Sequence, residues 1–534
     1  MTIPDPAERG RGGRLTLPLG HLVLEIPGAR LTPPEAASVP VTGVQHDSRA
    51  VREGDLFVAR AGGRAHGERF IADAIARGAR AVLVAAGSSA DTQGAPRVEA
   101  PDVPLALALV ADALHGHPTF TLEVVGITGT NGKTTTAHLT QAVINACGGR
   151  AGIIGTVGYR FEDLDLPATH TSPEADVLAR VAADMVAHGA SHLVMEVSSI
   201  ALAAKRADAV RFRVAAFTNL TQDHLDYHGT MEAYAAAKAR LFLDLGPGGA
   251  AINVDDPFGR ALVDKLAPRG AAGPYLCRVA RYSTELGLPE DAAEIAPLEM
   301  EQSAAGTRLR ARTPAGEVEI VSPLLGAHNA SNLLTALSIA WLLGLDLQAA
   351  GRALSAPIPV AGRLERCDEP GRDDVIVLVD YAHTPDALAR ALASVRGLAE
   401  GRLWCVFGCG GDRDPGKRPL MGEAVGGVAD VAVVTNDNPR SEDPRAIAEA
   451  ILPGLEGGRA RVVVELDRAR AIERAVLEAE RGDVVVLAGK GHEPYQIIGG
   501  ETLPFDDREH ARRALAARRA AREPARTPPA GGAP

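Results

Sequence analysis

The sequence has no apolar stretch long enough to cross a bilayer as a helix. Its first residues are rich in glycine, arginine and proline and carry Asp5 and Glu8, so they lack the apolar core of a secretion signal. Cysteine is scarce, with five in 534 residues, and this odd number does not suit a disulfide framework. These absences predict a cytoplasmic protein without membrane attachment.

Basic residues are not in excess either. The chain has 56 Lys and Arg against 67 Asp and Glu, a formal net charge of −11. Nucleic-acid binding relies on clustered basic side chains that neutralise phosphates, so this balance excludes a general affinity for nucleic acid. Cys405 and Cys409 lack a second cysteine pair, which favours buried thiols in a strand over a metal site.

What the chain does have is one glycine-rich run, GITGTNGKTTT at 126–136. Apolar residues before it and periodic apolar residues after it predict a strand, a tight loop and a helix. Gly129 and Gly132 free backbone N–H groups for an anion, Lys133 adds a positive charge, and Thr134 suits a magnesium ion. Ile127 replaces the first glycine of the common P-loop, so the kinase or GTPase pattern is not met. A glycine-rich turn that binds nothing is the alternative.

Length and pattern predict three domains of α/β class. The chain is too long for one core, and strands that alternate with helices imply mostly parallel sheets covered on both faces. We expect a small N-terminal α/β domain at 16–118, a central P-loop mononucleotide-binding parallel sheet at 119–355 and a C-terminal Rossmann-like domain at 356–515. A disordered tail is expected at 516–534, and an antiparallel excursion at 277–322.

Polar residues collect after the predicted strands, where ligands bind in such folds. In the central domain Glu196 and His224 suit magnesium, although a lone histidine is more often structural. In the third domain Asp380 suits ribose hydroxyls and Arg413 suits an anion. The runs TNDNPR at 435–440 and GKGHE at 489–493 put opposite charges at one sheet edge. Singly, each run suits a capped turn; together they form a rim suited to a zwitterion.

These runs together resemble the Mur ligase family over about residues 41–510. In family order the matching runs are DSRAVREGDLFVA, GTNGKT, TSPEA, MEVSS, TNLTQDHLDYHG, GAHNASN, AGRLE, DYAHTPDAL, FGCGGDRDPGKRPLM, TNDNPRSEDP and AGKGHE. The resemblance implies an ATP-dependent amide ligase of cytoplasmic peptidoglycan precursor synthesis. It implies that meso-2,6-diaminopimelate is joined, through an acyl phosphate, to the D-Glu γ-carboxylate of UDP-N-acetylmuramoyl-L-Ala-D-Glu.

The resemblance also implies site residues. The implied catalytic residues are Lys133, His224 and Lys238, the last as N6-carboxylysine, a carbamate. The implied magnesium ligands are Thr134, Glu196, His224 and carbamylated Lys238. The implied ATP-binding residues are Gly129, Thr130, Asn131, Gly132, Lys133, Thr134, Thr135, Asn329, Asn332, Arg363 and Asp380. The implied UDP-muramoyl-dipeptide-binding residues are Ser48, Thr171, Ser172, Ser198 and Arg206. The implied diaminopimelate-binding residues are Arg413, Asp437, Asn438, Pro439, Arg440, Gly489 and Glu493.

Alternatives stay open at this point. A solvated helix lysine is the alternative for Lys238, and a capped turn is the alternative for Ser48. The sequence departs from the family at Ile200-Ala201, where relatives commonly have His-Gly, and at Ala204, where they have a substrate-binding glutamine. Rival functions are the same ligase using L-lysine or L-ornithine, and a non-catalytic nucleotide-binding regulator. We expect a monomer.

Overall fold

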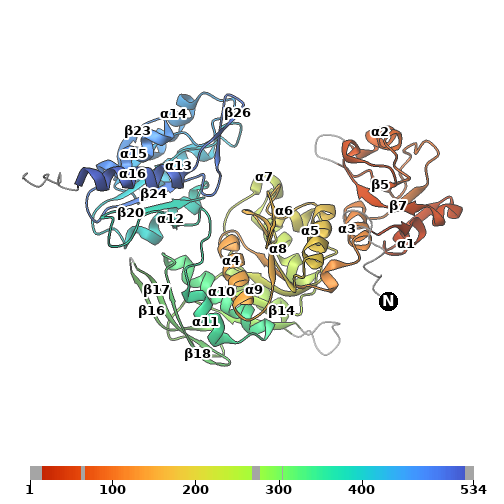
Figure 1. The fold of residues 1–534 in the computed structure, drawn as a ribbon, viewed down its shortest axis with the longest axis horizontal. Coiled ribbons are helices and arrows are strands. Elements are labelled where there is room, and N and C mark those ends of the chain that lie inside the picture. The colour runs from red at the N-terminus through yellow and green to blue at the C-terminus, as the bar shows by residue number, and fades with distance from the viewer. Residues whose placement is uncertain (1–14, 62–65, 268–276, 304, 523–534) are drawn as a thin grey trace, which may run out of the picture. The chain divides into compact units, whose positions relative to one another are not determined.

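The computed structural model describes residues 15–61, 66–267, 277–303 and 305–522 (Figure 1). Contacts within the chain divide it into two compact units. The first holds the chain up to Glu299 together with Arg310–Ile320 and Ser331–Ser355, and the second holds Met300–Leu309, Val321–Ala330 and the chain from Ala356. Within the described ranges no helix is both long enough and apolar enough to span a bilayer.

The N-terminal part of the first unit is a five-stranded sheet of order β2-β7-β6-β5-β4. Strands β4 to β7 pair in parallel, and β2 pairs antiparallel with β7. Because side chains alternate between faces, Leu83 packs toward α1 and α3 while Val82 packs toward α2. The bounds are β1 Leu17–Pro18, α1 Leu19–Leu24, β2 Arg30–Thr32, β3 Pro40–Val41, β4 Gly43–Gln45, β5 Asp55–Val58, α2 Ile71–Ala76, β6 Ala81–Ala85, β7 Arg97–Ala100 and α3 Val103–Leu114.

The larger sheet of the first unit has eight strands in the order β11-β10-β9-β12-β8-β13-β14-β15. Six of them, from β9 to β15 in that order, run parallel. Val124 faces the helices α5 and α8, and Val125 faces α4 and α10. The bounds are β8 Glu123–Thr128, α4 Lys133–Ala146, β9 Ala151–Gly155, β10 Gly158–Phe161, β11 Leu164–Leu166, α5 Ala175–Ala187, β12 His192–Glu196, α6 Ser199–Ala203, β13 Phe212–Phe217, α7 Leu225–His228, α8 Met231–Leu243, β14 Gly249–Asn253, α9 Pro257–Leu266 and β15 Arg278–Tyr282.

The predicted antiparallel excursion at 277–322 is wrong in its first part. Strand β15 pairs in parallel with β14, and its buried Ala280 and Tyr282 anchor it at the edge of the large sheet. Only the later residues form a separate three-stranded sheet, of order β16-β17-β18. The bounds are β16 Ala296–Ser303, β17 Gly306–Thr313, β18 Gly316–Ser322, α10 Ala327–Leu343 and α11 Leu347–Ser355.

The main sheet of the second unit has the order β19-β20-β24-β21-β22-β23. All five strands predicted for this part are confirmed, and they pair in parallel. Helices α12 to α14 cover one face, and α15 and α16 cover the other. The bounds are β19 Glu365–Arg366, β20 Ile376–Asp380, α12 Pro385–Arg396, β21 Leu403–Phe407, α13 Lys417–Gly426, β22 Val431–Val434, α14 Pro444–Leu455, β23 Arg461–Val464, α15 Arg468–Glu478, β24 Val484–Ala488, β25 Tyr495–Ile498, β26 Glu501–Pro504 and α16 Asp507–Arg522.

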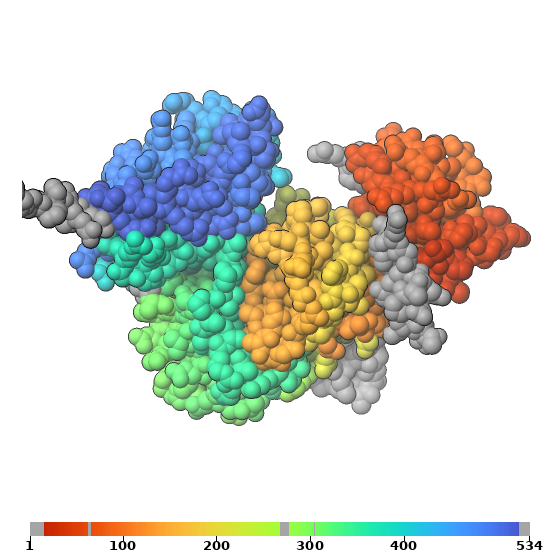
Figure 2. Space-filling view, viewed as in Figure 1, coloured from red at the N-terminus to blue at the C-terminus, as the bar shows by residue number. Residues whose placement is uncertain are grey.

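Helix α16 forms the dark blue band on the visible face of the second unit (Figure 2). It continues through Arg522, so the predicted disorder from residue 516 is wrong as far as 522; residues 523–534 lie outside the described residues. Ion pairs hold the helix, with Arg518 at 2.9 Å from Asp374 and Arg519 at 2.8 Å from Asp373. The arginines of this segment therefore bind the acidic stretch before β20.

A fully buried ion pair joins α15 to α16. The guanidinium of Arg468 lies 2.6 Å from the carboxylate of Asp507, and neither side chain is exposed. Arg468 also donates to the carbonyls of Asn436, at 3.1 Å, and Ala488, at 3.0 Å. These carbonyls follow β22 and end β24, so one side chain ties the two helices to the carboxyl end of the sheet.

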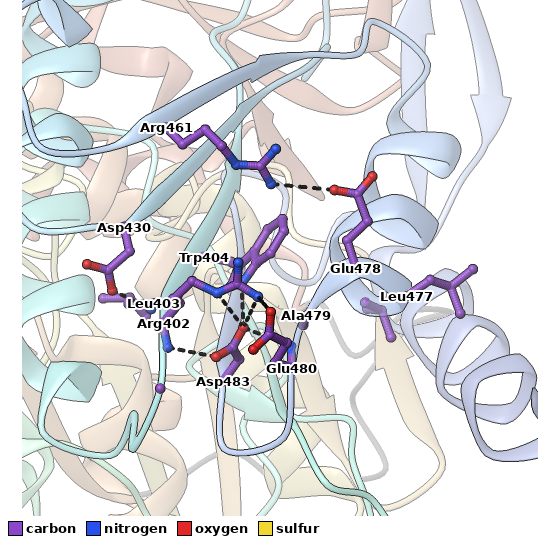
Figure 3. A network of polar contacts seen from close by, with 12 residues as sticks. Arg402, Leu403, Trp404, Asp430, Arg461, Leu477, Glu478, Ala479, Glu480 and Asp483 are labelled. Carbon is purple, nitrogen blue, oxygen red and sulfur yellow. Dashed lines mark hydrogen bonds and ion pairs between the residues drawn. The ribbon is translucent and has the colours of Figure 1, made fainter. Parts of the chain in front are cut away.

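Asp483 anchors the turn before β24 (Figure 3). Its carboxylate accepts hydrogen bonds from the indole N–H of Trp404 at 2.8 Å and from the backbone N–H groups of Arg402 at 2.7 Å and Glu480 at 2.9 Å. The residue is 1% exposed, so these donors replace the water that the charge has lost. The network fixes β24 against β21, and β24 leads into the run at 489–493.

Candidate active site

The loop between β8 and α4 is shaped by two glycines. Gly129 has φ +151°, and a Cβ there would lie 1.9 Å from Thr218 Oγ1; Gly132 has φ +87°, and a Cβ there would lie 2.5 Å from Asn332 Oδ1. Lys133 Nζ donates to the carbonyls of Gly129 at 2.9 Å and Thr130 at 2.8 Å, so the ammonium group folds over the loop. Because α4 begins at Lys133, the N–H groups of its first turn open toward the same loop, as in anion-binding sites.

Residues after β13 hold this loop in place. The backbone N–H of Asn131 donates to Asn219 Oδ1 at 2.9 Å, and Thr218 Oγ1 donates to the Asn131 carbonyl at 2.6 Å. Thr130 Oγ1 donates to the Thr221 carbonyl at 3.0 Å. Thr218 and Thr221 belong to the TNLTQDHLDYHG run, but no site role was predicted for either of them. Thr135 and Asn332 are buried beside the loop, on α4 and α10.

Glu196 lies buried at the end of β12 and faces the start of α4. Its Oε2 accepts a hydrogen bond from Thr134 Oγ1 at 2.9 Å, and its Oε1 accepts one from the Thr156 N–H at 2.8 Å. A Cβ on Gly155 would lie 2.3 Å from Oε1, so the carboxylate fits because this position is glycine. A buried carboxylate beside a hydroxyl is an all-oxygen donor pair, and these residues therefore fit magnesium.

His224 directly precedes α7 and is partly exposed. It has φ +51° at the N-terminus of α7, its side chain is 44% exposed, and its Nε2 lies 3.4 Å from Asp223 Oδ2. Among the described residues no three His, Cys, Asp or Glu side chains cluster as metal ligands. Water and phosphate oxygens would have to complete the coordination of an ion at Thr134 and Glu196.

Lys238 lies inside the protein, one turn or more from either end of α8. Its side chain is 1% exposed, and Nζ donates to the Gly129 carbonyl at 2.8 Å. Nζ also lies 4.5 Å from the centre of the Tyr234 ring. Burial, with the nearby charge of Lys133, holds the pKa of Lys238 well below its usual range. The solvated helix lysine is therefore wrong, and the amine has the neutral character that reaction with carbon dioxide requires.

Four of the five predicted muramoyl-dipeptide residues lie around the carbonyl and side chain of Glu196. Ser172 Oγ donates to the Glu196 carbonyl at 2.8 Å and accepts the Ser198 N–H at 2.9 Å. Arg206 donates to the Ser172 carbonyl at 3.2 Å. Thr171 Oγ1 lies 3.1 Å from Thr156 Oγ1, and the fifth residue, Ser48, is buried in a 3₁₀ turn after β4.

Glu174 is a further residue beside this group, and no role was predicted for it. It forms ion pairs with Arg206 at 2.6 Å and with Arg60 at 2.8 Å. It thus fixes the guanidinium of Arg206, a predicted ligand-binding group. The residue stands inside the TSPEA run quoted above, which was the available signal.

Three predicted ATP-binding residues belong to the second unit. Asp380 ends β20 and accepts the N–H groups of Leu364 and Ala382, both at 2.8 Å. Burial raises the pKa of Asp380. Arg363 stacks 5.1 Å from the centre of the Tyr381 ring, and Asn329 Nδ2 donates to the Leu325 carbonyl at 2.7 Å.

The predicted amino-acid site gathers at the carboxyl ends of β21, β22 and β24. Arg440 has φ +52°, and its Nη1 donates to the Gly411 carbonyl at 2.7 Å. A Cβ on Gly410 would lie 2.9 Å from that nitrogen, and a Cβ on Gly411 would lie 1.9 Å from the Pro439 carbonyl oxygen. The glycine run thus packs directly against the DNPR run. Arg413 in the same loop is exposed.

Opposite charge comes from the loop after β24. Glu493 Oε2 accepts a hydrogen bond from Asn438 Nδ2 at 3.0 Å. Gly489 has φ +112°, and a Cβ there would lie 2.4 Å from Asp437 Oδ2. Lys490, which was given no role, is fully buried between these residues. Its neighbours Gly489 and Glu493 in the AGKGHE run were predicted as ligand-binding residues, but no local sequence pattern predicts the burial of Lys490.

Family models match most of the chain. Residues 40–115 match "Mur ligase family, catalytic domain", residues 127–340 match "Mur ligase middle domain", and residues 362–491 match "Mur ligase, glutamate ligase domain". The strands and loops described above all fall within or beside these matches.

Two relatives bear the name UDP-N-acetylmuramoyl-L-alanyl-D-glutamate–2,6-diaminopimelate ligase. The one from Synechococcus elongatus is 43% identical over 511 residues, which is 94% of this chain and 100% of the relative. The one from Chromobacterium violaceum is 44% identical over 485 residues, which is 90% of this chain and 95% of the relative.

Solved structures agree. One described as UDP-N-acetylmuramoyl-L-alanyl-D-glutamate–2,6-diaminopimelate ligase aligns with a TM-score of 0.67 and 34% identity, over 94% of this chain and 99% of its own. A folylpolyglutamate synthase from Mycobacterium tuberculosis, at 22% identity, TM-score 0.56, and 71% of this chain and 91% of its own, shares the fold. The chain, with its three domains of α/β class, therefore belongs to the Mur ligase family.

Proposed function

We propose that this chain is a MurE-type ligase, which joins meso-2,6-diaminopimelate to the D-Glu γ-carboxylate of UDP-N-acetylmuramoyl-L-Ala-D-Glu and converts ATP to ADP and phosphate. The names of relatives aligned over nearly their full length support the proposal. The observation that carries the chemistry is the contact of Thr134 with Glu196 beside the Lys133 loop. The positively charged Lys133, the anion-binding start of α4 and the buried carboxylate of Glu196 meet there, as phosphoryl transfer requires.

In the first step the γ-carboxylate of D-Glu attacks the γ-phosphorus of ATP. The bond from that phosphorus to the β,γ-bridging oxygen breaks, ADP leaves, and an acyl phosphate forms. Lys133 neutralises charge on the transferred phosphoryl group, and the N–H groups at the start of α4 orient it. Magnesium, when bound near Thr134 and Glu196, supplies further charge neutralisation.

In the second step the amine of diaminopimelate attacks the acyl carbon. A tetrahedral intermediate forms, the C–O bond to phosphate breaks, and the nitrogen loses a proton as the amide forms. No side chain of the protein needs to act as a nucleophile. The protein contributes by binding the reactants in line and by neutralising charge.

Lys238 takes part as a carbamate. Its neutral amine attacks carbon dioxide, a C–N bond forms, a proton is lost to solvent, and the amine nitrogen then carries a carboxylate. That change would turn a buried neutral amine near Lys133 into a negatively charged oxygen ligand for a second magnesium ion. His224, which directly precedes α7, would supply a nitrogen ligand.

The amino acid is selected by groups of opposite charge. Arg440, with Asn438 and Arg413, binds the distal carboxylate of diaminopimelate, and Glu493 with Gly489 binds its distal ammonium. L-Lysine has no distal carboxylate and leaves the Arg440 guanidinium without an anionic partner from the substrate. Such a polar mismatch discriminates by about 10⁴-fold.

The setting follows from the reaction. Nucleotide-linked precursors and ATP are cytoplasmic metabolites, so we place the enzyme in the cytoplasm, as a monomer that needs neither nucleic acid nor membrane. Ser48 contacts the uracil end of the nucleotide sugar, and Thr171, Ser172, Ser198 and Arg206 bind the muramoyl dipeptide. Asn329 and Asn332 lie near the adenine of ATP, and Arg363 and Asp380 face its ribose and phosphates.

Mass spectrometry of the product tests the proposal. The purified chain receives ATP, magnesium, UDP-N-acetylmuramoyl-L-Ala-D-Glu and an equimolar mixture of diaminopimelate, L-lysine and L-ornithine. The expected product carries diaminopimelate, and Lys133→Ala lowers its rate of formation about 1,000-fold. Lys265→Ala, which removes an exposed lysine on α9, is the matched control and leaves the rate unchanged. A lysine or ornithine product, or ATP binding without any product, contradicts the proposal.

A further inference from the structure

Lys490 is a buried cation in contact with two predicted amino-acid-binding residues. Its side chain has no exposed surface, and Nζ donates to Asn438 Oδ1 at 3.2 Å and to Glu493 Oε2 at 3.4 Å. Nζ also lies 5.5 Å from the centre of the Tyr495 ring. Asn438 follows β22, Lys490 and Glu493 follow β24, and Tyr495 begins β25, so the cluster is part of one compact unit.

The contacts fix the orientation of the Asn438 amide. Asn438 Oδ1 accepts hydrogen bonds from Lys490 and from the Ile497 N–H at 2.9 Å, so this end of the amide must be oxygen. Its nitrogen therefore faces Glu493 and donates to Oε2 at 3.0 Å. Both Asn438 and Lys490 thus bind the same oxygen of the glutamate. Within the described part of the chain, Glu493 Oε1 accepts no hydrogen bond, and it is the atom left for a ligand.

The charges around Lys490 are also matched to a cationic ligand. Asp437 and Glu493 carry two negative charges and Lys490 carries one positive charge, while the nearby Arg468–Asp507 pair is neutral as a whole. The remaining charge of −1 is opposite to the charge of one incoming ammonium group. Burial lowers the pKa of Lys490, and the nearby carboxylates of Asp437 and Glu493 oppose that shift. The positive charge of a second ammonium group is therefore balanced only while Lys490 and Asn438 hold Glu493 in place.

We infer that Lys490 is a positioning residue for amino-acid selection, which presents Glu493 Oε1 to the distal ammonium of the substrate by binding Oε2 and orienting Asn438. The inference rests on the proposed function, since it assigns Glu493 to the distal ammonium. Lys490 itself contacts no substrate atom and acts through Glu493.

The test compares two amino acids that differ only at the distal amine. Diaminopimelate has this amine, whereas 2-aminoheptanedioate keeps the distal carboxylate and the reacting amine but lacks it. For Lys490→Met, we expect the ratio of kcat/KM for diaminopimelate over 2-aminoheptanedioate to fall about tenfold. The KM values for ATP and for the UDP-linked substrate stay within about twofold of the wild type. Lys265→Met is the matched control and keeps the wild-type ratio.

A purely structural role gives a different result, because a distorted site loses both amino acids equally. An unchanged ratio, or an equal loss for both substrates, overturns the inference. If Lys490→Met does not fold, Lys490→Gln, which keeps a donor but removes the charge, is measured in the same way with the same two outcomes. The double variant with Glu493→Gln is expected to be no worse than Glu493→Gln alone, and additive losses also overturn the inference.

The same measurements distinguish a failure of the proposed function from a failure of the role assigned to Lys490. If the wild-type protein releases no ADP in response to diaminopimelate, the proposed function is wrong. If the wild type prefers diaminopimelate over 2-aminoheptanedioate and Lys490→Met keeps that preference, the proposed function stands and the role of Lys490 is wrong.

Discussion

Thr134 and Glu196 are joined by a hydrogen bond of 2.9 Å although 62 residues separate them in the chain. Thr134 is the second residue of α4, the helix after the glycine loop, and Glu196 ends the neighbouring strand β12. The parallel pairing of β8 with β12 brings the two together, so the sheet topology itself creates the oxygen donor pair.

Replacing Glu196 with glutamine tests this donor pair. Glu196→Gln keeps the shape but removes the charge that a divalent ion needs, so we expect ADP release at saturating substrates to fall about 100-fold. Initial rates of ADP release over a magnesium titration check this expectation. The magnesium concentration that gives half of the maximal rate should be higher for the variant than for the wild type. Glu162→Gln, at an exposed turn of the same sheet, is the control. An unchanged magnesium midpoint in Glu196→Gln contradicts the role of this carboxylate.

Lys238 gives a prediction that separates stability from activity. Its folded-state pKa lies well below its unfolded value, so between the two values the unfolded chain binds a proton that the folded chain lacks. In carbon-dioxide-free buffer without ligands, the free energy of unfolding should therefore rise with pH up to about pH 10.4, the unfolded value. Lys238→Met removes this contribution.

We thus expect Lys238→Met to be more stable than the wild type near pH 7 and to have lost ligase activity. Thermal unfolding followed by circular dichroism should show Tm raised by about 2 °C or more. The difference from wild type should shrink as pH rises. A lower Tm for Lys238→Met at pH 7, or retained ligase activity, would refute the assignment.

Arg440 should govern the use of the amino acid. Arg440→Ala removes the guanidinium that donates to the Gly411 carbonyl, and we expect kcat/KM for diaminopimelate to fall about 100-fold or more. The KM for ATP should change little, because the phosphate loop belongs to the other unit. Arg445→Ala, at an exposed position in the first turn of α14, is the control. Equal losses for ATP and diaminopimelate would count against this assignment.

Asp483 should matter for stability rather than chemistry. Asp483→Ala leaves the buried N–H groups of Trp404, Arg402 and Glu480 without an acceptor, and we expect a loss of about 3 kcal/mol in unfolding free energy. Chemical denaturation followed by Trp fluorescence measures it, with Glu449→Ala on the exposed face of α14 as the control. A loss no larger than that of the control would show that the network in Figure 3 contributes little.

Most of the fold could be predicted from the sequence because its strands are buried on both faces. Val484–Ala488, for example, is a continuous apolar run with every residue buried, and such runs stand out from the helices around them. The glycine loop was readable for a related reason, since Gly129 and Gly132 adopt backbone angles and close contacts that only glycine allows.

What was missed depends on partners distant in the sequence. Residues 516–522 are rich in alanine and arginine, and within this stretch Arg518 and Arg519 are paired with the distant carboxylates of Asp374 and Asp373. The burial of Lys490 could not be predicted from its neighbours in the sequence, because its contact Asn438 lies 52 residues earlier. His224 was expected near Glu196 because both follow strands, and this stays a prediction; its side chain is 44% exposed and lies 3.4 Å from Asp223.

The Arg468–Asp507 ion pair has a consequence for biosynthesis. A guanidinium inside the protein is tolerable only with its counter-ion, and that counter-ion arrives with α16, 39 residues later in the chain. Until residue 507 has left the ribosome, the nascent second unit carries an uncompensated charge at the strand ends beside Asn436 and Ala488. The pocket proposed for the incoming amino acid is therefore completed late, only once synthesis has reached α16.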